Sequence, residues 1–354
     1  MELSPLPYAY GEPSLTGILR QRPEDFVVEE ILGFEPEGEG EHVFLWIEKI
    51  GHNTQQLAER LAKLAKVPVR HVSYSGMKDR NAVTRQWFSV HLPGNNSVDW
   101  ESLNSSAVNG SKIRVLKHAR HLRKLRRGVH SANQFVIGIS ELEGDLDSLP
   151  ARLQIMTSRG VPNYFGEQRF GYDGRNLQQA QRWFAGEFKP KRHQQGLYLS
   201  AARAYLFNQL LAKRVEQRTW DQLLNGELVM LAGSHSLFLR DSSCDSSCDS
   251  DANTGDDLAA RLTGGDIHPT GPLYGKADGL LCGGEVSQLE HSVLAEYSSL
   301  LEGLEKAGLI AARRALRMIP ADLKWQLHHN RVDITFSLPS GCFATSVMRE
   351  LVNH

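Results

Sequence analysis

The stretch from Ser73 to Trp87 holds the residues whose types and spacing are best suited to chemistry. Its one carboxylate, Asp79, stands between the cations Lys78 and Arg80. A carboxylate in such a setting can act as a nucleophile or as a base. The alternative is a solvated turn in which Asp79 caps the backbone or pairs with its neighbours. Taken alone, the stretch favours this structural alternative.

Two apolar runs flank Asp79 and predict the elements that position it. The run Val67–Val72 precedes the stretch, and the alternating run Trp87–Leu92 follows it. Alternation with a period of two is typical of a half-buried strand. Gly76 and the charged residues after it therefore predict a turn between two strands, and such turns often carry functional groups.

A second group of candidates is a strongly basic segment, residues 112–127. It holds eight Lys and Arg residues and no acid, with His118 and His121 interleaved. Such a run can follow a phosphate backbone, which favours a nucleic-acid partner over the alternative of a solvated charged surface. The predicted RNA-backbone contacts are Lys117, Arg120, Arg123, Lys124, Arg126 and Arg127.

The overall charge conceals this basic segment. The chain of 354 residues has 40 Lys and Arg against 41 Asp and Glu, a formal net charge of −1. Residues 241–257 carry six of the acids and no Lys or Arg. This tract repeats Asp-Ser-Ser-Cys and has little apolar surface, which predicts a disordered insertion. Cys244 and Cys248 have no nearby His and no second Cys pair, so their spacing does not predict a metal site.

Composition and length predict a cytoplasmic protein of two domains. A chain with 41% hydrophobic and 23% charged residues has an ordinary globular composition. No apolar run approaches the length of a membrane span, and the first residues lack the basic and apolar parts of a signal peptide. The four cysteines form no disulfide framework, which suits a reducing compartment.

Periodicity predicts strands at both ends of the chain and helices in the middle. Further strands are predicted at 26–32, 43–50, 113–116, 133–139 and 332–338, and helices at 54–66, 146–158, 176–185, 198–214 and 286–306. Sheet-rich sequence that brackets a helix-rich middle is typical of one domain inserted into another. We expect an α+β fold with a mixed, mainly antiparallel sheet domain formed by 1–158 and 318–354. A helix-rich α/β domain, 159–317, is inserted into it and contains the 241–257 tract.

Six segments in chain order resemble the motifs of the TruD-type tRNA pseudouridine synthases, within the pseudouridine synthase superfamily. The segments are Arg20-x-x-Pro23-Glu24-Asp25-Phe26, Gly76-Met77-Lys78-Asp79-Arg80-x-Ala82-Val83-Thr84-x-Gln86, Asn133-x-Phe135, 160–171, 266–275 and 343–351. Together they span nearly the whole chain and are far more specific than any one of them. The acidic tract falls between them and touches none.

The resemblance implies a function and a set of site residues. Members of this family convert uridine to pseudouridine in RNA, and the bacterial enzymes act at position 13 of certain tRNAs without a metal or an organic cofactor. The outer segments would then form a catalytic domain of the pseudouridine synthase type, and the inserted one a TRUD domain. The catalytic aspartate falls on Asp79, and the substrate-binding residues fall on Phe26, Asn133 and Phe343. We expect a monomer with tRNA as its partner and no membrane attachment.

The chemistry leaves the role and the partner of Asp79 open. An ionised Asp79 can attack C1′ of the ribose or remove a proton at C2′. Arg20 is the predicted cation beside it, with Arg80 and Lys78 as rivals. Phe135 is apolar where other pseudouridine synthases use tyrosine, so a phenolic proton relay is not expected there. A stacked uridine must be extruded to react, and we expect a cleft between the domains with Asp79 at its floor.

Two other function classes compete with this interpretation. One is a non-catalytic RNA-binding or RNA-chaperone protein, which would use the basic segment without chemistry at Asp79. The other is a metal-dependent hydrolase, which the scattered histidines disfavour because no ligand set has useful spacing.

Overall fold

A computed structural model describes residues 3, 5–94, 96–108, 110–240, 254–277, 279 and 281–353. The chain forms two compact units, which we call the sheet unit and the helical unit. The sheet unit comprises Ser14–Leu146, Ala321–Gly341 and Asn353–His354. The helical unit comprises Met1–Pro13, Asp147–Pro320 and Cys342–Val352.

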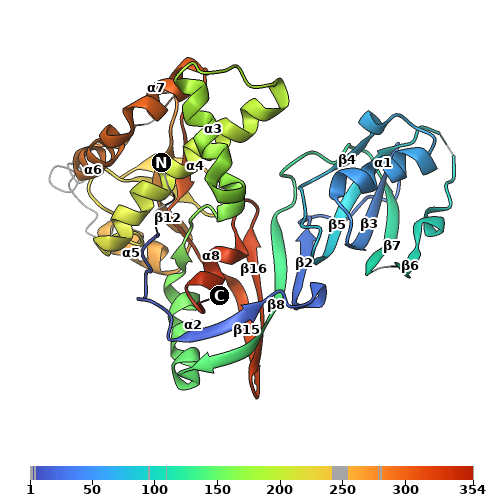
Figure 1. Ribbon diagram of the computed structural model, residues 1–354, viewed down its shortest axis with the longest axis horizontal. Helices are drawn as coiled ribbons and strands as arrows, with labels where there is room; N and C mark the ends of the chain where they lie inside the picture. Colours follow the sequence, from blue (N-terminus) through green and yellow to red (C-terminus); the bar gives the residue numbers. More distant parts are fainter. Residues whose placement is uncertain are drawn as a thin grey trace. The chain divides into compact units, whose positions relative to one another are not determined.

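Among the described residues, the sheet unit contains one ten-stranded sheet, ordered β15-β16-β8-β2-β5-β3-β7-β6, with β1 beside β8 and β4 beside β5 (Figure 1). The strands are β1 (Leu15–Leu19), β2 (Phe26–Ile31), β3 (His42–Ile50), β4 (Val72–Tyr74), β5 (Val83–His91), β6 (Ser105–Val108), β7 (Ser111–His121), β8 (Ala132–Gly144), β15 (Ala321–His328) and β16 (Arg331–Pro339). The ladders are antiparallel except β2 with β5. This parallel pair aligns the start of β5 with the first half of β2, close to the Asp79 loop.

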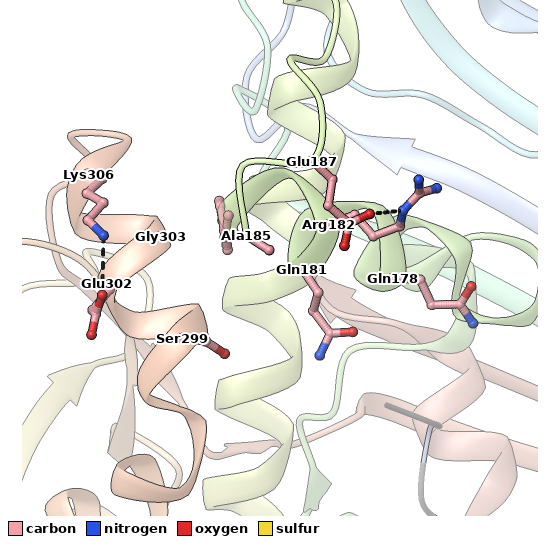
Figure 2. A pocket seen from close by; sticks show the side chains of 10 residues that line it. Gln178, Gln181, Arg182, Ala185, Glu187, Ser299, Glu302, Gly303 and Lys306 are labelled. Atoms are coloured by element: carbon pink, nitrogen blue, oxygen red, sulfur yellow. Dashed lines mark hydrogen bonds and ion pairs between the residues drawn. The ribbon is translucent and has the colours of Figure 1, made fainter.

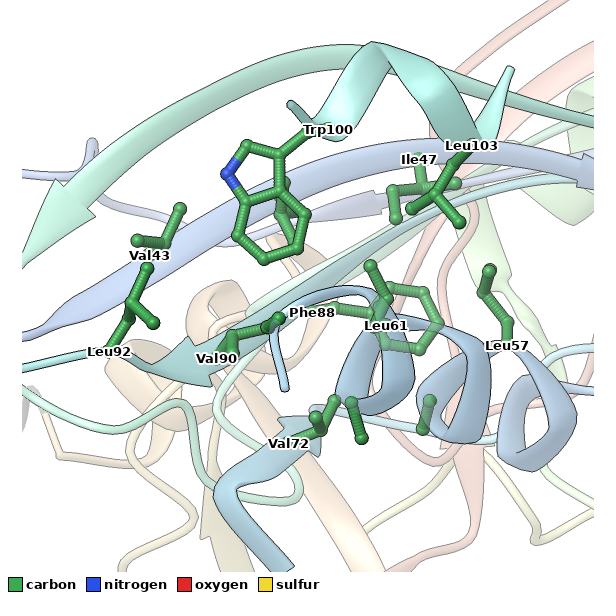
Figure 3. Packing of buried hydrophobic residues seen from close by; sticks show 14 of the residues in the cluster. Val43, Ile47, Leu57, Leu61, Val72, Phe88, Val90, Leu92, Trp100 and Leu103 are labelled. Atoms are coloured by element: carbon green, nitrogen blue, oxygen red, sulfur yellow. The ribbon is translucent and has the colours of Figure 1, made fainter. Parts of the chain in front are cut away.

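Helix α1 (Thr54–Leu64) covers one face of the sheet unit. Asn53 and Gln56 form a capping box at its start, which satisfies backbone donors that the first turn leaves free. Leu57 and Leu61 are fully buried, and Figure 3 shows them directed towards Phe88. Burial of a leucine side chain stabilises a fold by about 1.5–3 kcal/mol, so this apolar face is what attaches α1 to the sheet.

The loop between β4 and β5 carries Asp79, as the sequence predicts. The strand predicted over Val67–Val72 is wrong, however, because β4 begins only at Val72. Residues Val69–His71 form a 3₁₀ turn after Pro68, and proline removes a donor that a ladder needs. The strand predicted over 113–116 is longer in the structure, because β7 continues into the basic segment and ends at His121.

The helical unit packs helices around a small sheet. Its helices are α2 (Leu149–Arg159), α3 (Arg175–Phe184), α4 (Arg192–Glu216), α5 (Thr254–Thr263), α6 (Gly284–Leu294), α7 (Ser298–Lys306) and α8 (Ala344–Arg349). The strands β10 (Leu228–Leu231), β11 (Leu237–Leu239), β12 (Ile267–Leu273) and β13 (Ala312–Ala315) form one sheet, and β9 (Val161–Pro162) pairs with β14 (Arg317–Met318). The buried face of α4, with Ala201, Leu206 and Phe207, is the centre of this packing.

Helices α3 and α7 approach each other closely because Gly303 faces the Phe184 ring, where any side chain would collide. Beside this contact lies a surface hollow of about 480 Å³. Figure 2 shows that its charged side chains pair with each other: Arg182 with Glu187, and Lys306 with Glu302. The four charged side chains that line this hollow therefore already have partners.

The mixed α+β fold with a mainly antiparallel sheet is confirmed. The helix predicted over 286–306 is two helices, α6 and α7, with a 3₁₀ turn at Ala295–Tyr297 between them. Most of the predicted disordered tract, 241–253, lies outside the described residues, and its last four residues begin α5. Within the described ranges, no helix has both the length and the apolar character needed to cross a membrane.

Candidate active site

Asp79 forms an ion pair with Arg20. Arg20 Nη1 donates to Asp79 Oδ2 at 2.9 Å, and the backbone N–H of Asn81 donates to Oδ1 at 3.0 Å. Both oxygens of the Asp79 carboxylate therefore accept a hydrogen bond, one of them from a cation. The side chains of Arg20 and Asp79 are 29% and 31% exposed, so a substrate can still reach the carboxylate.

The backbone of Arg20 is strained in a way that directs its side chain. Its φ of +59° lies in the left-handed region, which costs about 1–2 kcal/mol for a residue with a Cβ. The guanidinium carbon lies 3.9 Å from the centroid of the Phe26 ring, within the range of a cation–π contact. Phe26 is itself buried and touches Phe135 edge-on. Phe26, which is predicted to bind the substrate, therefore packs against Arg20 in this structure.

A hydrogen bond from the buried Lys49 fixes the main chain at Asp79. The side chain is fully buried, and its Nζ donates to the backbone carbonyl of Asp79 at 2.8 Å. Burial lowers the pKa of the Lys49 ammonium to about 8, and the charge of Asp79 partly opposes this shift. A buried cation under the loop adds positive potential at the carboxylate and fixes the loop that carries it.

The two rival cations are engaged elsewhere. Arg80 Nε donates to the carbonyl of Gly51 at 3.0 Å. Lys78 Nζ lies 3.0 Å from Glu30 Oε1, and both side chains are buried. Burial raises the pKa of the Glu30 carboxyl, and the Lys78 ammonium opposes the rise. Arg20 is thus the cation whose side chain pairs with Asp79 in this structure, and its role in catalysis stays a prediction.

The amide of Asn133 has a fixed orientation. Lys78 Nζ contacts Asn133 Oδ1 at 2.5 Å, and an ammonium can only donate. The Nδ2 atom must then face His130 Nε2, 3.3 Å away. His130 is buried, which lowers its pKa to about 4, so the ring is neutral and Nε2 can accept. Asn133 therefore keeps one N–H and one lone pair for a ligand.

The neutral His130 is itself held by two hydroxyl groups. Its Nδ1 contacts Ser75 Oγ, and its Nε2 lies 3.2 Å from Ser340 Oγ. Because Ser340 and Asn133 both donate to Nε2, the proton of the ring belongs on Nδ1. Sequence reasoning missed Lys49, Glu30 and His130. Polar residues at buried positions of apolar strands, such as Lys49 in β3, are the signal that could have found the first two.

Phe343 belongs to the helical unit. Its ring lies 6.0 Å from Phe165, with the guanidinium of Arg169 5.8 Å away. Arg314 covers the Phe165 ring at 4.1 Å. The structure thus places Phe343 in a cluster of aromatic rings and guanidinium groups. Its predicted place beside the substrate stays a prediction, as does the expected cleft.

The basic segment divides into paired and unpaired cations. Lys117 pairs with Glu35 at 2.7 Å, and Arg120 donates to the backbone carbonyls of Gly40, Leu92 and Asn96. Arg120 thus ties three backbone segments of the sheet unit together, whereas the Lys117–Glu35 pair is exposed to solvent. By contrast, Arg123 and Arg126 are exposed and form no ion pair with any described residue.

Lys124 and Arg127 complete the basic segment. Lys124 Nζ donates to the carbonyl of Arg70 at 3.2 Å, and Arg127 lies over the Tyr74 ring. Four exposed cations of the segment are thus gathered at 123–127, the loop after β7, while Arg114 and Lys117 are exposed on β7 itself. Across the described part of the chain, no group of three or more His, Cys, Asp or Glu side chains could hold a metal ion.

Comparisons with known proteins identify the family. The family model of tRNA pseudouridine synthase D (TruD) matches residues 3–180 and 188–351. The chain is 46% identical to tRNA pseudouridine synthase D of Methylococcus capsulatus over 349 residues, covering 98% of this chain and 94% of that protein. It is 45% identical to the protein of the same name from Aeromonas hydrophila, with 99% and 94% covered.

A solved structure supports the fold. A crystal structure from Methanosarcina mazei, described as a TruD protein, superposes with a TM-score of 0.69 at 20% identity and covers 98% of this chain and 95% of that one. The family match includes every residue named above for the site. The chain belongs to the tRNA pseudouridine synthase D (TruD) family.

Proposed function

We propose that this protein isomerises uridine to pseudouridine in tRNA, at position 13, with Asp79 as the reacting carboxylate. The observation that carries the proposal is the ion pair of Asp79 with Arg20 at 2.9 Å, above the buried Lys49, in a chain of this family. Two cations around one accessible carboxylate suit chemistry that needs an anion at the ribose.

The reaction exchanges one bond of uracil for another and needs no oxidant, reductant or water. The N1–C1′ bond breaks and uracil leaves with the electron pair. Asp79 either attacks C1′ and forms an ester, or removes the C2′ proton and leaves a C1′–C2′ double bond. The base then turns and C5 bonds to C1′. In the first route this breaks the ester and frees Asp79, and in the second route C2′ takes back its proton. The C5 proton is lost while N1 gains one. The product is an isomer of the substrate.

Asn133 is suited to hold the uracil ring while it is detached. Its free N–H can donate to a uracil carbonyl, and its orientation is set by Lys78 and His130. Cytosine carries an amine where uracil has a carbonyl at C4, and this amine would donate towards the N–H of Asn133, which also donates. A contact at this position therefore favours uridine over cytidine. Phe343 and Phe26 are the proposed stacking partners. For Phe26 this requires that Arg20 move off its ring.

The exposed cations of the loop 123–127 supply the proposed contacts with the tRNA backbone. Extrusion of a stacked nucleotide costs a few kcal/mol, and phosphate contacts offset that cost without reading sequence. Neutral Gln in place of Arg123, Lys124 and Arg126 should weaken tRNA binding and lower its salt dependence. An unchanged slope of log K against log salt would count against a phosphate role for these side chains.

The test is direct mapping of pseudouridine in tRNA. The purified protein is incubated with unmodified tRNA transcripts, and every uridine is mapped by carbodiimide labelling and primer extension. We expect pseudouridine at position 13 of a subset of the transcripts. Binding without any pseudouridine would favour the non-catalytic RNA-binding alternative, and modification at another position would remove the assignment to position 13.

A further inference from the structure

The sheet unit has a hollow of about 630 Å³ between α1, the 3₁₀ turn at 69–71, β4 and the basic loop. Small-molecule sites typically have volumes of about 300–1,000 Å³, so this hollow is large enough for a nucleotide. Its walls include Tyr74 and the side chains of Lys124, Arg126 and Arg127. Asp79 does not line it.

Two kinds of group meet in the hollow. Arg127 places its guanidinium 5.5 Å from the centroid of the Tyr74 ring, and Tyr74 is held in turn by an edge-on contact with Phe88 at 5.9 Å. Aromatic rings and guanidinium planes are the groups on which unpaired bases stack. Arg126 is exposed beside them and can meet a phosphate.

The hollow lies a short way along the chain from Asp79. Tyr74 precedes Asp79 by five residues, which span at most about 18 Å when extended. The N–H of Gly128 donates to the carbonyl of Ser75 at 2.8 Å, so the basic loop is fixed against the end of β4. A strand of RNA with its target at Asp79 would reach the hollow within a few nucleotides.

We propose that this hollow binds a second, unpaired nucleotide of the RNA substrate. Its base stacks against the pair of Tyr74 and Arg127, and its phosphate contacts Arg126. The proposal rests on the proposed function for the nature of the substrate, tRNA. It adds a recognition site that binds the base of an unpaired nucleotide near the target, in addition to the contacts with backbone phosphates.

The test separates stacking from charge by measuring tRNA binding over a range of salt concentrations. Tyr74→Leu keeps the apolar contact with Phe88 but removes the ring. Loss of one stacked base should weaken binding about 5- to 150-fold with the salt slope unchanged. Arg126→Gln should instead reduce the slope by about 0.7–0.9. Trp325→Leu, which removes a partly exposed ring from β15, is the matched control and should bind as the unaltered protein does.

A second measurement uses the unaltered protein and so does not depend on how the variants fold. A tRNA transcript substituted with 4-thiouridine is irradiated in the complex, and the linked peptides are identified by mass spectrometry. We expect links to the segment 69–74 or to 124–127. Tyr74→Leu binding equal to that of Trp325→Leu, or links confined to other segments, would overturn the proposal.

These outcomes are distinct from failure of the proposed function. If position 13 gains pseudouridine but Tyr74→Leu binds normally, only the nucleotide hollow is refuted. If no uridine is modified, the function fails, while the binding data still decide whether the hollow holds a base.

Discussion

Replacement of Lys49 by Met should make the sheet unit more stable and the protein less active. Burial lowers the pKa of Lys49 from 10.5 to about 8. One pKa unit corresponds to about 1.4 kcal/mol, so a protonated Lys49 opposes folding by about 3 kcal/mol near neutral pH. Loss of the hydrogen bond to the Asp79 carbonyl offsets about 1 kcal/mol of the gain. We expect the variant to gain about 2 kcal/mol in free energy of unfolding.

The stability advantage of Lys49→Met should depend on pH, because the folded and the unfolded chain release the Lys49 proton at different pH values. Below pH 8 both the folded and the unfolded chain carry a protonated Lys49, and the penalty is fully present. As the pH rises past 8, the folded chain releases the proton while the unfolded chain keeps it up to its own pKa of 10.5. The penalty therefore disappears over that range, and the advantage of Lys49→Met shrinks by about 2 kcal/mol between about pH 7.5 and about pH 9.5.

The assay follows the stability of the sheet unit and the reaction in parallel. Hydrogen exchange of the β3 and β5 amides reports local stability, and release of tritium from uridine labelled at C5 reports turnover. We expect turnover to fall about 10- to 100-fold, because the Asp79 loop loses its support and small misplacements are costly. Lys324→Met, an exposed lysine on β15, is the control. A variant less stable than the unaltered protein, or an advantage that does not shrink with pH, would refute the reasoning.

Three further predictions test the neighbours of Asp79 and the acidic tract. Arg20→Gln should lower kcat/KM about 100-fold or more. Arg20→Lys keeps the charge but loses the planar contact with the Phe26 ring, so its kcat/KM should fall less. Equal losses of kcat/KM in the two variants would argue against a role for the charge. His130→Leu removes the acceptor that orients Asn133 and should lower kcat/KM about 10-fold. Since the pKa of His130 is about 4, pH–rate profiles of the two proteins should keep the same shape above pH 6, and a shape that differs there would contradict a neutral ring. Deletion of 243–255 should leave turnover unchanged, because the tract touches no family motif; a large loss would show that it contributes to activity.

Much of the fold was predictable because the apolar pattern is strong where the elements are long. The helix at Asn53 was predicted from a capping residue followed by leucines on one face, and α1 has that form. The strand predicted over Val67–Val72 is wrong, because Pro68 and the 3₁₀ turn after it override the apolar pattern. The residues 286–306 have the periodicity of one helix, and only packing shows where the chain turns at Ala295–Tyr297.

The candidate site was predictable in its charged pair and not in its support. Asp79 and Arg20 stand in two motifs that the sequence displays, and the structure joins them. The apolar strands around Lys49 and Glu30 mark these two residues as unusual, but no local pattern shows which residues they meet. Strand pairing across tens of residues brings them and His130 to Asp79. For the basic segment, the sequence shows which residues are charged but not what each charge does. The structure divides them into residues that hold the fold, such as Arg120, and residues that face solvent.

The central claim is that the Asp79 carboxylate performs the reaction, and Asp79→Asn tests it most directly. Asparagine keeps the shape and removes the charge, and Asp322→Asn, at an exposed position of β15 with a left-handed φ of +52° that Asn tolerates, is the matched control. Each variant is mixed with unmodified tRNA, and pseudouridine and tRNA binding are measured together. We predict that Asp79→Asn binds tRNA but forms no pseudouridine, while Asp322→Asn does both. Undiminished pseudouridine formation by Asp79→Asn would contradict the account.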